Sequence, residues 1–329
     1  MSFCFILAAQ TYTWKSVTVH GMGFVTGIIA HPLDQNLVYA KTDVGGLYRW
    51  EASNSAWVPL LDGKGIGLSI ESFAISPANP SLIYIATDSS IYKSADQGNT
   101  WARQSLPVFM DGNGEWRQAG ERLAVDPNGN GAVVYFGSRK NGLWKSSNSG
   151  STWAQISIVS IPVGADAGVS FVAFDKASGN ATTASSKIYA GVMGSGIYQT
   201  SNGGTSWELI PGGPATSLRP IGASIGTNGK VYVAYAGTAI GGPGAVYVFD
   251  GASLSAITPS NTAGSGFCGI SVDPSNPLRI ITAEFNAGPQ KTLHLSNDGG
   301  VSWIELPFNN GSQSMAGLKN VTEPPYYPT

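Results

Sequence analysis

Short runs in which apolar and polar residues alternate recur along the chain, separated by turn-forming residues. Between residues 121 and 156, four such runs follow one another, at 121–127, 132–137, 142–146 and 153–156. Alternation with a period of two is typical of strands that bury one face, and runs this short are too brief for helices. The pattern predicts four consecutive antiparallel strands, which is the composition of one β-propeller blade.

The loop between the third and fourth runs carries a motif that repeats. Its pattern, Ser/Thr-x-Asp/Asn-x-Gly-x-Thr/Ser-Trp, returns at intervals of about fifty residues, with one interval about twice as long. Decayed copies at Val248–Gly251 and before Trp57 complete the series. The period predicts a propeller with six recognisable blades. The four complete motifs are Ser94–Trp101, Ser146–Trp153, Thr200–Trp207 and Ser296–Trp303.

The acidic or amide residue of this motif, an Asp box, is expected to be structural. Its side chain can bond backbone N–H groups of its own turn, while the glycine adopts a left-handed conformation. The tryptophan then packs between blades. A residue that repeats in every blade cannot lie in one shared site, which argues against a catalytic or calcium-binding role.

The two ends of the chain leave the closure of the ring open. Trp14–Val17 has the pattern of a fourth strand without its own blade, and only about twenty residues follow Pro307, too few for three strands. Either six blades close with a spare outer strand, or a seventh blade is missing or incomplete. We expect an incomplete or loosely closed ring that exposes apolar edges of the first and sixth blades.

Composition narrows the range of partners. Only 12% of the residues are charged, the net charge is −2, and no run of lysine and arginine occurs. The chain therefore lacks the cluster of positive charge that binds a nucleic acid or an anionic membrane. A neutral, hydroxyl-rich ligand fits this composition better. Cys4, Cys268 and three scattered histidines show no metal-ligand spacing, so we expect no metal and no other cofactor. The chain is expected to be a monomer.

The first residues differ from the rest. Phe3–Ala9 is apolar and resembles the end of a signal peptide, although the basic start of such a peptide is lacking. Residues 1–10 are interpreted as a truncated signal segment, with a frayed N-terminus as the alternative, and residues 11–329 as a single propeller domain. We therefore expect a secreted, extracellular protein. Three N-glycosylation sequons agree with secretion and begin at Asn180, Asn310 and Asn320.

The antiparallel order of the strands sorts the loops onto two faces. The boxes and the turns between the first and second strands, such as Asp126-Pro127, fall on one face. The loops between the second and third strands and those between blades fall on the opposite face. Because these loops vary in length and content, we call this the variable face and expect function there. The loops 42–46 and 106–120 belong to it.

Six strings carry a resemblance to a known family. The most specific are Thr42–Arg49 (Thr-Asp-Val-Gly-Gly-Leu-Tyr-Arg) and Gly120–Pro127 (Gly-Glu-Arg-Leu-Ala-Val-Asp-Pro). The others are Tyr12–Val17, Gly23–Ile28, Tyr135–Gly137 and Gly142–Ser146. They resemble the N-terminal propeller of family 74 glycoside hydrolases, the xyloglucanases. The resemblance implies inverting hydrolysis of the β-1,4-glucan backbone of xyloglucan, a plant cell-wall polysaccharide. It also implies two tandem seven-bladed propellers, and the second is absent from this chain.

The resemblance assigns the catalytic base to Asp43 and the acid to the second propeller. An inverting hydrolase needs a base that activates water and an acid that protonates the leaving oxygen. Asp43 is expected on the variable face, accessible to solvent and outside any box-like turn. Gly45, Gly46 and Tyr48 of the same string are expected to bind substrate, since glycines let a ligand approach the backbone. The alternative is that Asp43 and its counterpart Asp88 cap turns.

The loop 106–120 offers Trp116 and Arg117 for sugar binding. A flat aromatic ring suits the apolar face of a glucose unit, and an arginine can bond hydroxyl groups. The alternative for Trp116 is an anchor that packs the loop. Glu121 and Arg122 are expected to form a buried pair. Candidates for a local acid, each of which can equally be solvated, are Asp111, Glu115 and Glu284.

Two classes of function follow. The first is a glycoside hydrolase of the xyloglucanase type that is complete only with its second half. The second is a non-catalytic propeller that binds glycans or a protein partner with the same face. A sialidase is the weaker third reading, because it needs an arginine cluster for a carboxylate and the string that carries its first arginine is absent.

Overall fold

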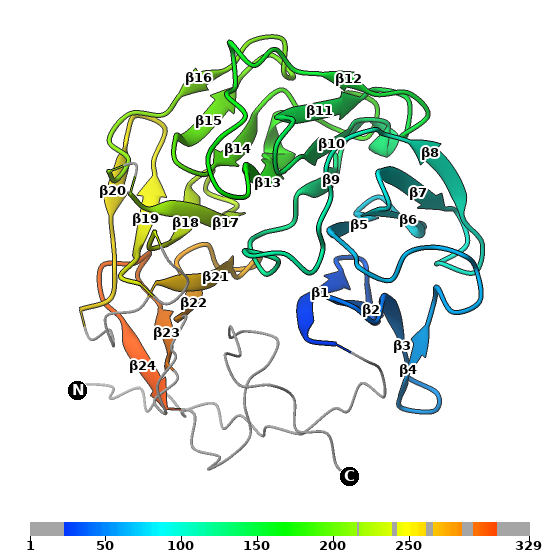
Figure 1. The fold of residues 1–329 in the computed structure, drawn as a ribbon. Coiled ribbons are helices and arrows are strands. Elements are labelled where there is room, and N and C mark those ends of the chain that lie inside the picture. Colours follow the sequence, from blue (N-terminus) through cyan, green and yellow to red (C-terminus); the bar gives the residue numbers. More distant parts are fainter. Residues whose placement is uncertain (1–22, 216, 239–241, 261–265, 285–291, 308–329) are drawn as a thin grey trace.

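The strands form six antiparallel four-stranded blades around a central axis (Figure 1). The structure is a computed structural model that describes residues 23–215, 217–238, 242–260, 266–284 and 292–307. The expected six-bladed, all-β propeller is confirmed, and within these ranges only two short 3-10 turns, η1 (Gly129–Gly131) and η2 (Lys176–Ser178), are helical.

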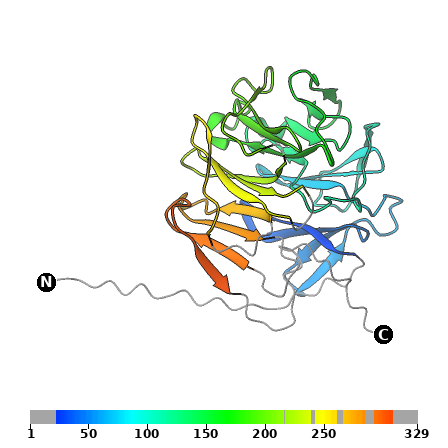
Figure 2. The same cartoon turned by 60° about the vertical axis from the view of Figure 1, so that its left-hand side comes forward.

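Each blade starts at the axis and proceeds outward in chain order (Figure 1), and Figure 2 shows the same ring of blades from a second direction. Blade one contains β1 (Val25–His31), β2 (Asp34–Thr42), β3 (Leu47–Glu51) and β4 (Ala56–Pro59); blade two β5 (Ser72–Ser76), β6 (Asn79–Thr87), β7 (Ser90–Ser94) and β8 (Ala102–Ser105); blade three β9 (Leu123–Val125), β10 (Val134–Gly137), β11 (Leu143–Ser146) and β12 (Ala154–Gln155).

The second half of the ring repeats this order. Blade four contains β13 (Val169–Phe174), β14 (Ile188–Val192), β15 (Gly196–Thr200) and β16 (Glu208–Leu209); blade five β17 (Arg219–Ile225), β18 (Val231–Ala236), β19 (Ala245–Phe249) and β20 (Leu254–Ala256); blade six β21 (Phe267–Val272), β22 (Ile280–Glu284), β23 (Thr292–Ser296) and β24 (Ile304–Pro307). The segments 1–22 and 308–329 lie outside the described residues. The truncated signal segment and the loose closure beside Trp14–Val17 therefore stay predictions.

The Asp boxes are closed by local hydrogen bonds. In blade two, Asp96 Oδ1 accepts from the backbone N of Thr100 at 2.8 Å and from Ser94 Oγ at 2.8 Å. Gly98 has a φ of +91°, the left-handed region that glycine tolerates. Hydrogen bonds from the side chain and backbone of Thr100 hold the pKa of Asp96 at about 2. The box is a turn that its own side chain stabilises.

Blades two and three are each also tied to the box of the blade that follows. Lys93 Nζ, on β7, donates to the carbonyl oxygen of Ser149 in the box of blade three, at 3.1 Å. Lys145 Nζ, on β11, donates in the same way to Gly203 O in blade four, at 2.7 Å. The box tryptophans Trp101 and Trp153 pack against the interfaces of blades one with two and two with three. The expectation that the box tryptophans pack between blades is confirmed there.

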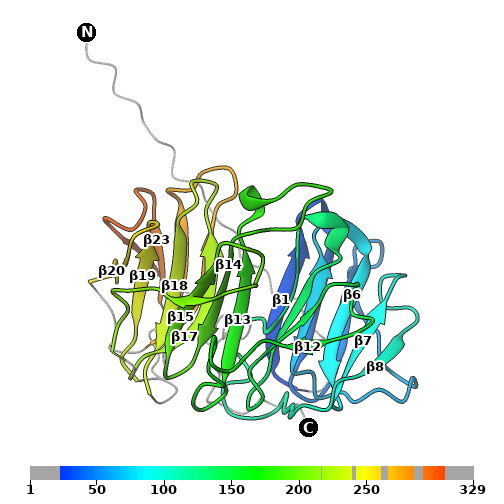
Figure 3. The same cartoon turned by 90° about the horizontal axis from the view of Figure 1, so that it is seen from above.

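The two faces of the propeller differ as the loop order predicts, and Figure 3 shows the strands running between them. On the variable face, the inner strand of several blades begins with a register shift. In blade one this irregularity lies between Val25 and Gly27, opposite Thr42 and Lys41 of β2. Irregularities of this kind bend a strand and redirect its side chains. The mouth of the ring is thus shaped by the starts of its inner strands.

Candidate functional site

Asp43 follows β2 directly, at the variable face. Its Oδ1 accepts a hydrogen bond from the backbone N of Phe24 at 2.7 Å, and its Oδ2 accepts one from Arg117 Nε at 3.0 Å. The turn after it is closed by Thr42, whose Oγ1 accepts from the backbone N of Gly45 at 2.7 Å. A carboxylate has about four lone-pair positions, so these two bonds leave acceptor capacity free. The expectation that Asp43 lies outside a box-like turn is confirmed.

The expected solvent accessibility of Asp43 is wrong. Its side chain is only 9% exposed, because Arg117 covers one oxygen and the chain before β1 covers the other. Gly23 packs directly on the carboxylate of Asp43, because a Cβ added to Gly23 would lie only 2.6 Å from Asp43 Oδ1. The carboxylate is therefore held in place and has little free rotation.

Asp88 is the counterpart of Asp43 in blade two and shares half of this arrangement. Its Oδ2 accepts from the backbone N of Gly67, at 2.6 Å, in the segment that leads into β5. Asp88 is exposed and has a φ of +51°. Among the residues that the structure describes, no cation pairs with it. In both blades the aspartate accepts a hydrogen bond from the backbone that leads into the inner strand. Only Asp43 also pairs with an arginine among the described residues.

The segment 106–120, which we call the strap, extends from β8 to β9 and reaches into the middle of the ring (Figure 1). Trp116 packs there against residues of blades four, five and six and is only 2% exposed. This burial favours the alternative of a loop anchor, and the expected stacking of Trp116 on a sugar stays a prediction. The strap needs such an anchor because it crosses the mouth without strand pairing.

Arg117 lies next to this anchor and remains 27% exposed. Besides its ion pair with Asp43, its guanidinium lies 5.8 Å from the centre of the Phe24 ring. Its expected hydroxyl-binding role is untested, and the structure shows that it contacts the candidate base itself.

The remaining expected substrate-binding residues lie below the surface. Tyr48 is 5% exposed, and burial raises the pKa of its phenol. Gly45 and Gly46 are buried as well. Gly46 has a φ of +88°, and its backbone N donates to Leu68 O at 2.9 Å. Sugar binding by Tyr48, Gly45 and Gly46 stays a prediction, and in this structure the three residues are buried, with the following loop packed on Gly46.

A buried charge cluster supports the strap from below. Glu71 forms an ion pair with Arg122, whose Nε lies 2.9 Å from Oε1, and it accepts a hydrogen bond from Arg139 Nε at 2.8 Å. Its Oε2 also accepts from the backbone N of Asp111. Burial alone would raise the pKa of Glu71, but the two guanidinium groups hold it below its usual value. Sequence reasoning missed Glu71, which no motif marks.

The expected pair of Glu121 with Arg122 is replaced by two separate sets of contacts. Glu121 Oε2 accepts from Ser72 Oγ at 2.8 Å, and Lys41 is its main opposite charge. Burial raises the pKa of Glu121 despite that charge. Arg122 turns instead toward Glu71, because the inner strands place the two residues across neighbouring blades.

The three candidate acids fall into different environments. Glu115 is exposed and Asp111 is half-buried on the strap, so both remain near the mouth. Glu284 is buried, and its Oε1 lies 2.5 Å from His294 Nε2. The alternative of a solvated Glu284 is therefore ruled out, because its carboxylate is buried against His294. An exposed aromatic ring that sequence reasoning missed is Phe109, 43% exposed, with Lys140 Nζ at 4.4 Å.

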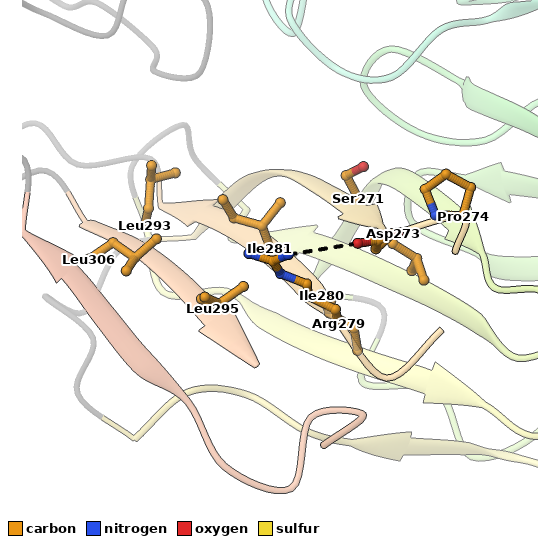
Figure 4. A pocket seen from close by; sticks show the side chains of 10 residues that line it. Ser271, Asp273, Pro274, Arg279, Ile280, Ile281, Leu293, Leu295 and Leu306 are labelled. Atoms are coloured by element: carbon orange, nitrogen blue, oxygen red, sulfur yellow. Dashed lines mark ion pairs between the residues drawn. The ribbon is translucent and has the colours of Figure 1, made fainter. Parts of the chain in front are cut away.

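A separate hollow of about 290 Å³ lies on blade six (Figure 4). The side chains of Ile281, Leu293, Leu295 and Leu306 line it, together with the turn Asp273-Pro274. That turn belongs to the box face, opposite to Asp43, so the hollow is not part of the candidate site.

The described ranges contain neither a metal-binding cluster nor a membrane-spanning helix. In these ranges, no cluster of three or more histidine, cysteine, aspartate or glutamate side chains has an arrangement that suits a metal ion. The same ranges contain no helix with the length and apolar character needed to span a bilayer.

No protein-family model matches the chain. A xyloglucanase from Paenibacillus sp is 35% identical over 338 aligned residues, which cover 91% of this chain and 33% of the relative. The family 74 xyloglucanase from Xanthomonas campestris superposes with a TM-score of 0.78 at 34% identity, over 91% of this chain and 47% of that one. The family 74 enzyme from Niastella koreensis gives a TM-score of 0.77 at 35% identity, over 88% and 46%.

The fold and the site thus define a six-bladed β-propeller whose variable face carries an aspartate clamped by a loop that crosses the ring. In sequence and in structure this propeller resembles the N-terminal propeller of the family 74 glycoside hydrolases, the xyloglucanases. The chain spans between a third and just under half of the length of these relatives.

Proposed function

We propose that this propeller supplies one half of the active site of a secreted xyloglucan hydrolase, with Asp43 as the catalytic base. The observation that carries the proposal is the distinct environment of Asp43. It has the same backbone bond as Asp88, but in addition an arginine from a remote loop holds its second oxygen. Turn capping needs only the backbone bond, so the added clamp points to a further role.

The proposed chemistry is inversion by a base and an acid. Asp43 accepts a proton from a water molecule that attacks the anomeric carbon, while an acid on the far side of the bond protonates the leaving oxygen. An inverting pair is about 6.5–9.5 Å apart, with room for the water between. We assign the acid to a second propeller that faces the variable face.

The same face supports the alternative of a non-catalytic glycan-binding propeller. The observation that favours it is the low exposure of Asp43, 9% for its side chain, with both oxygens already bonded. In that case Asp43 orders the mouth and takes no proton.

The test compares Asp43→Asn with Asp88→Asn in a protein that joins this chain to the second propeller of a family 74 xyloglucanase. We expect Asp43→Asn to lower kcat on xyloglucan by about 10²–10⁴-fold, because it removes the base, and Asp88→Asn to leave kcat nearly unchanged. Reducing-sugar release measures both. Retained activity in Asp43→Asn would refute the base assignment.

The chain by itself provides the second test. We expect it to bind xyloglucan weakly in affinity electrophoresis and to cleave it poorly, because one carboxylate cannot act as both acid and base at the same time. Turnover at ordinary enzyme rates by the isolated chain would mean that Asp111 or Glu115 acts as a local acid, and the two-half proposal would be wrong. Detection of the protein in the culture medium would test secretion.

A further inference from the structure

We propose that Arg117 is a positioning residue, which the strap places so that it holds the carboxylate of Asp43 in one orientation. The proposal rests on the proposed role of Asp43 as the base and adds a function for the strap. It changes the role expected for Arg117 from contact with substrate to control of the carboxylate that acts on water.

The contacts on Asp43 restrain both of its oxygens. Phe24 N binds Oδ1 at 2.7 Å and Arg117 Nε binds Oδ2 at 3.0 Å. A carboxylate bonded through only one oxygen can still rotate about its Cβ–Cγ bond, whereas bonds to both oxygens stop that rotation. Charge-assisted bonds from a guanidinium are short and directional, which suits it to this task.

Arg117 itself is held from both sides along the strap. On one side, the carbonyl oxygen of Glu115 accepts from Arg139 Nη1 at 2.6 Å, and Trp116 is 2% exposed in the core. On the other side, Ala119 is 2% exposed in the same core cluster. The anchored backbone holds Arg117 in one position. The entropy cost of ordering this side chain is therefore met on folding and not on substrate binding.

The backbone at Trp116 is strained to reach this position. Its φ is +64°, in the left-handed region, which is unfavourable for a bulky residue. Such strain persists only where the surrounding structure imposes it, and here the buried ring provides that constraint. The strained residue directly precedes Arg117.

The ion pair between Arg117 and Asp43 is not needed to form the turn at Asp43. Arg117 lies 74 positions from Asp43 in the chain. In blade two the equivalent Asp88 keeps its backbone bond to Gly67, and no arginine or lysine among the described residues pairs with it. The turn therefore forms without a cation, and the clamp on Asp43 is an additional feature.

The first test needs no turnover and uses this chain. Site-resolved hydrogen exchange by NMR is measured for the amide of Phe24 in the wild type and in Arg117→Ala, Arg117→Lys and Asp88→Asn. We expect Arg117→Ala to lose protection at Phe24, Arg117→Lys to keep part of it, and Asp88→Asn to keep all of it. Unchanged protection in Arg117→Ala overturns the proposal, because the Asp43 bond to Phe24 then does not depend on the arginine.

The second test measures kcat and KM on xyloglucan in the protein joined to a second propeller. We expect Arg117→Ala to lower kcat by as much as about 10²-fold, the loss typical of a misplaced catalytic group, with KM nearly unchanged. Added guanidinium ion should restore part of kcat in Arg117→Ala and none in Asp43→Asn. Arg279→Ala, which removes a half-exposed ion pair with Asp273 on the opposite face, is the matched control.

The outcomes separate the two proposals. A raised KM with unchanged kcat in Arg117→Ala means that Arg117 binds substrate, and it overturns the positioning role while leaving the base assignment intact. Full activity in Asp43→Asn overturns the proposed function itself. An equal loss in Arg117→Ala and Arg279→Ala, with a lowered Tm and no rescue by guanidinium, means a structural effect only and also overturns the positioning role.

Discussion

At the residue scale, the candidate site depends on charges that neighbouring blades bring together. Glu71 is the centre of this arrangement, since it pairs with Arg122 and Arg139 and accepts a bond from the backbone of the strap. Both arginines also have one buried nitrogen, Nη2, without a partner in the structure. The cluster therefore has more buried donors than acceptors. Its stability depends on the carboxylate of Glu71, which the two arginines share.

Replacement of Glu71 by glutamine should destabilise the propeller by about 3–5 kcal/mol, because two buried guanidinium groups lose their counter-charge. Urea unfolding measures the change in the free energy of unfolding. The control is Glu115→Gln, at an exposed position on the strap, for which we expect a change within about 0.5 kcal/mol. Equal stability of the two variants would mean that the cluster contributes little.

At the element scale, the Asp box is a turn whose chemistry differs slightly among blades. Blades two and six have an aspartate, Asp96 and Asp298, and hydrogen bonds hold the pKa of each at about 2. Blades three and four have Asn148 and Asn202, and the amide of Asn148 donates to Thr152 Oγ1 at 2.8 Å where the carboxylate of Asp96 accepts. Both residue types fit the turn, but only the aspartates titrate.

The double variant Asp96→Asn, Asp298→Asn should resist acid better. A folded-state pKa of about 2 lies below the ordinary value of about 3.9, so each carboxylate contributes stability above pH 4 that is lost as the pH falls toward 2. Asparagine does not titrate in this range, so the double variant does not lose stability in this way. Urea midpoints measured between about pH 2 and pH 5 should therefore decline less steeply than in the wild type. Parallel curves for the two proteins would contradict the assignment.

At the scale of the whole molecule, blade six has two different faces. One packs on blade five through Ile280, which is fully buried beside Tyr232 and Val272. The other lines the hollow in Figure 4 with Ile281 and Leu295, both only partly buried. Ile280 and Ile281 both border the hollow, but strand alternation sends their side chains to opposite faces. The two residues therefore form a matched pair for testing whether the second face is open.

We expect the double variant Ile281→Thr, Leu295→Thr to self-associate less than the wild type, with little change in Tm, because these side chains line an open hollow. Ile280→Thr should instead cost on the order of 2 kcal/mol or more, since it leaves a cavity and a buried hydroxyl. Light scattering and thermal unfolding measure the two effects. A comparable stability loss in both variants would show that protein covers this face.

The sequence by itself determined the blades and their boxes. The number of blades follows from a motif that repeats, and the box is closed by bonds between residues two to four positions apart, such as Ser94, Asp96 and Thr100. Short-range contacts of this kind depend on local residue order alone, so a pattern in the chain is sufficient to predict them. The assignment of loops to two faces follows in the same way from antiparallel order.

Only the tertiary structure decided what surrounds Asp43. Its pair with Arg117 spans 74 positions, and the pair of Glu71 with Arg139 spans 68. Both depend on the path of the strap across the ring, which is set by where Trp116 finds a buried site among blades four to six. No local pattern encodes that packing, because the residues that enclose Trp116 are distant in the chain and ordinary in type. For the same reason, sequence reasoning offered Trp116 and Tyr48 for sugar binding, with a packed anchor as the alternative for Trp116, and the folded chain buries both.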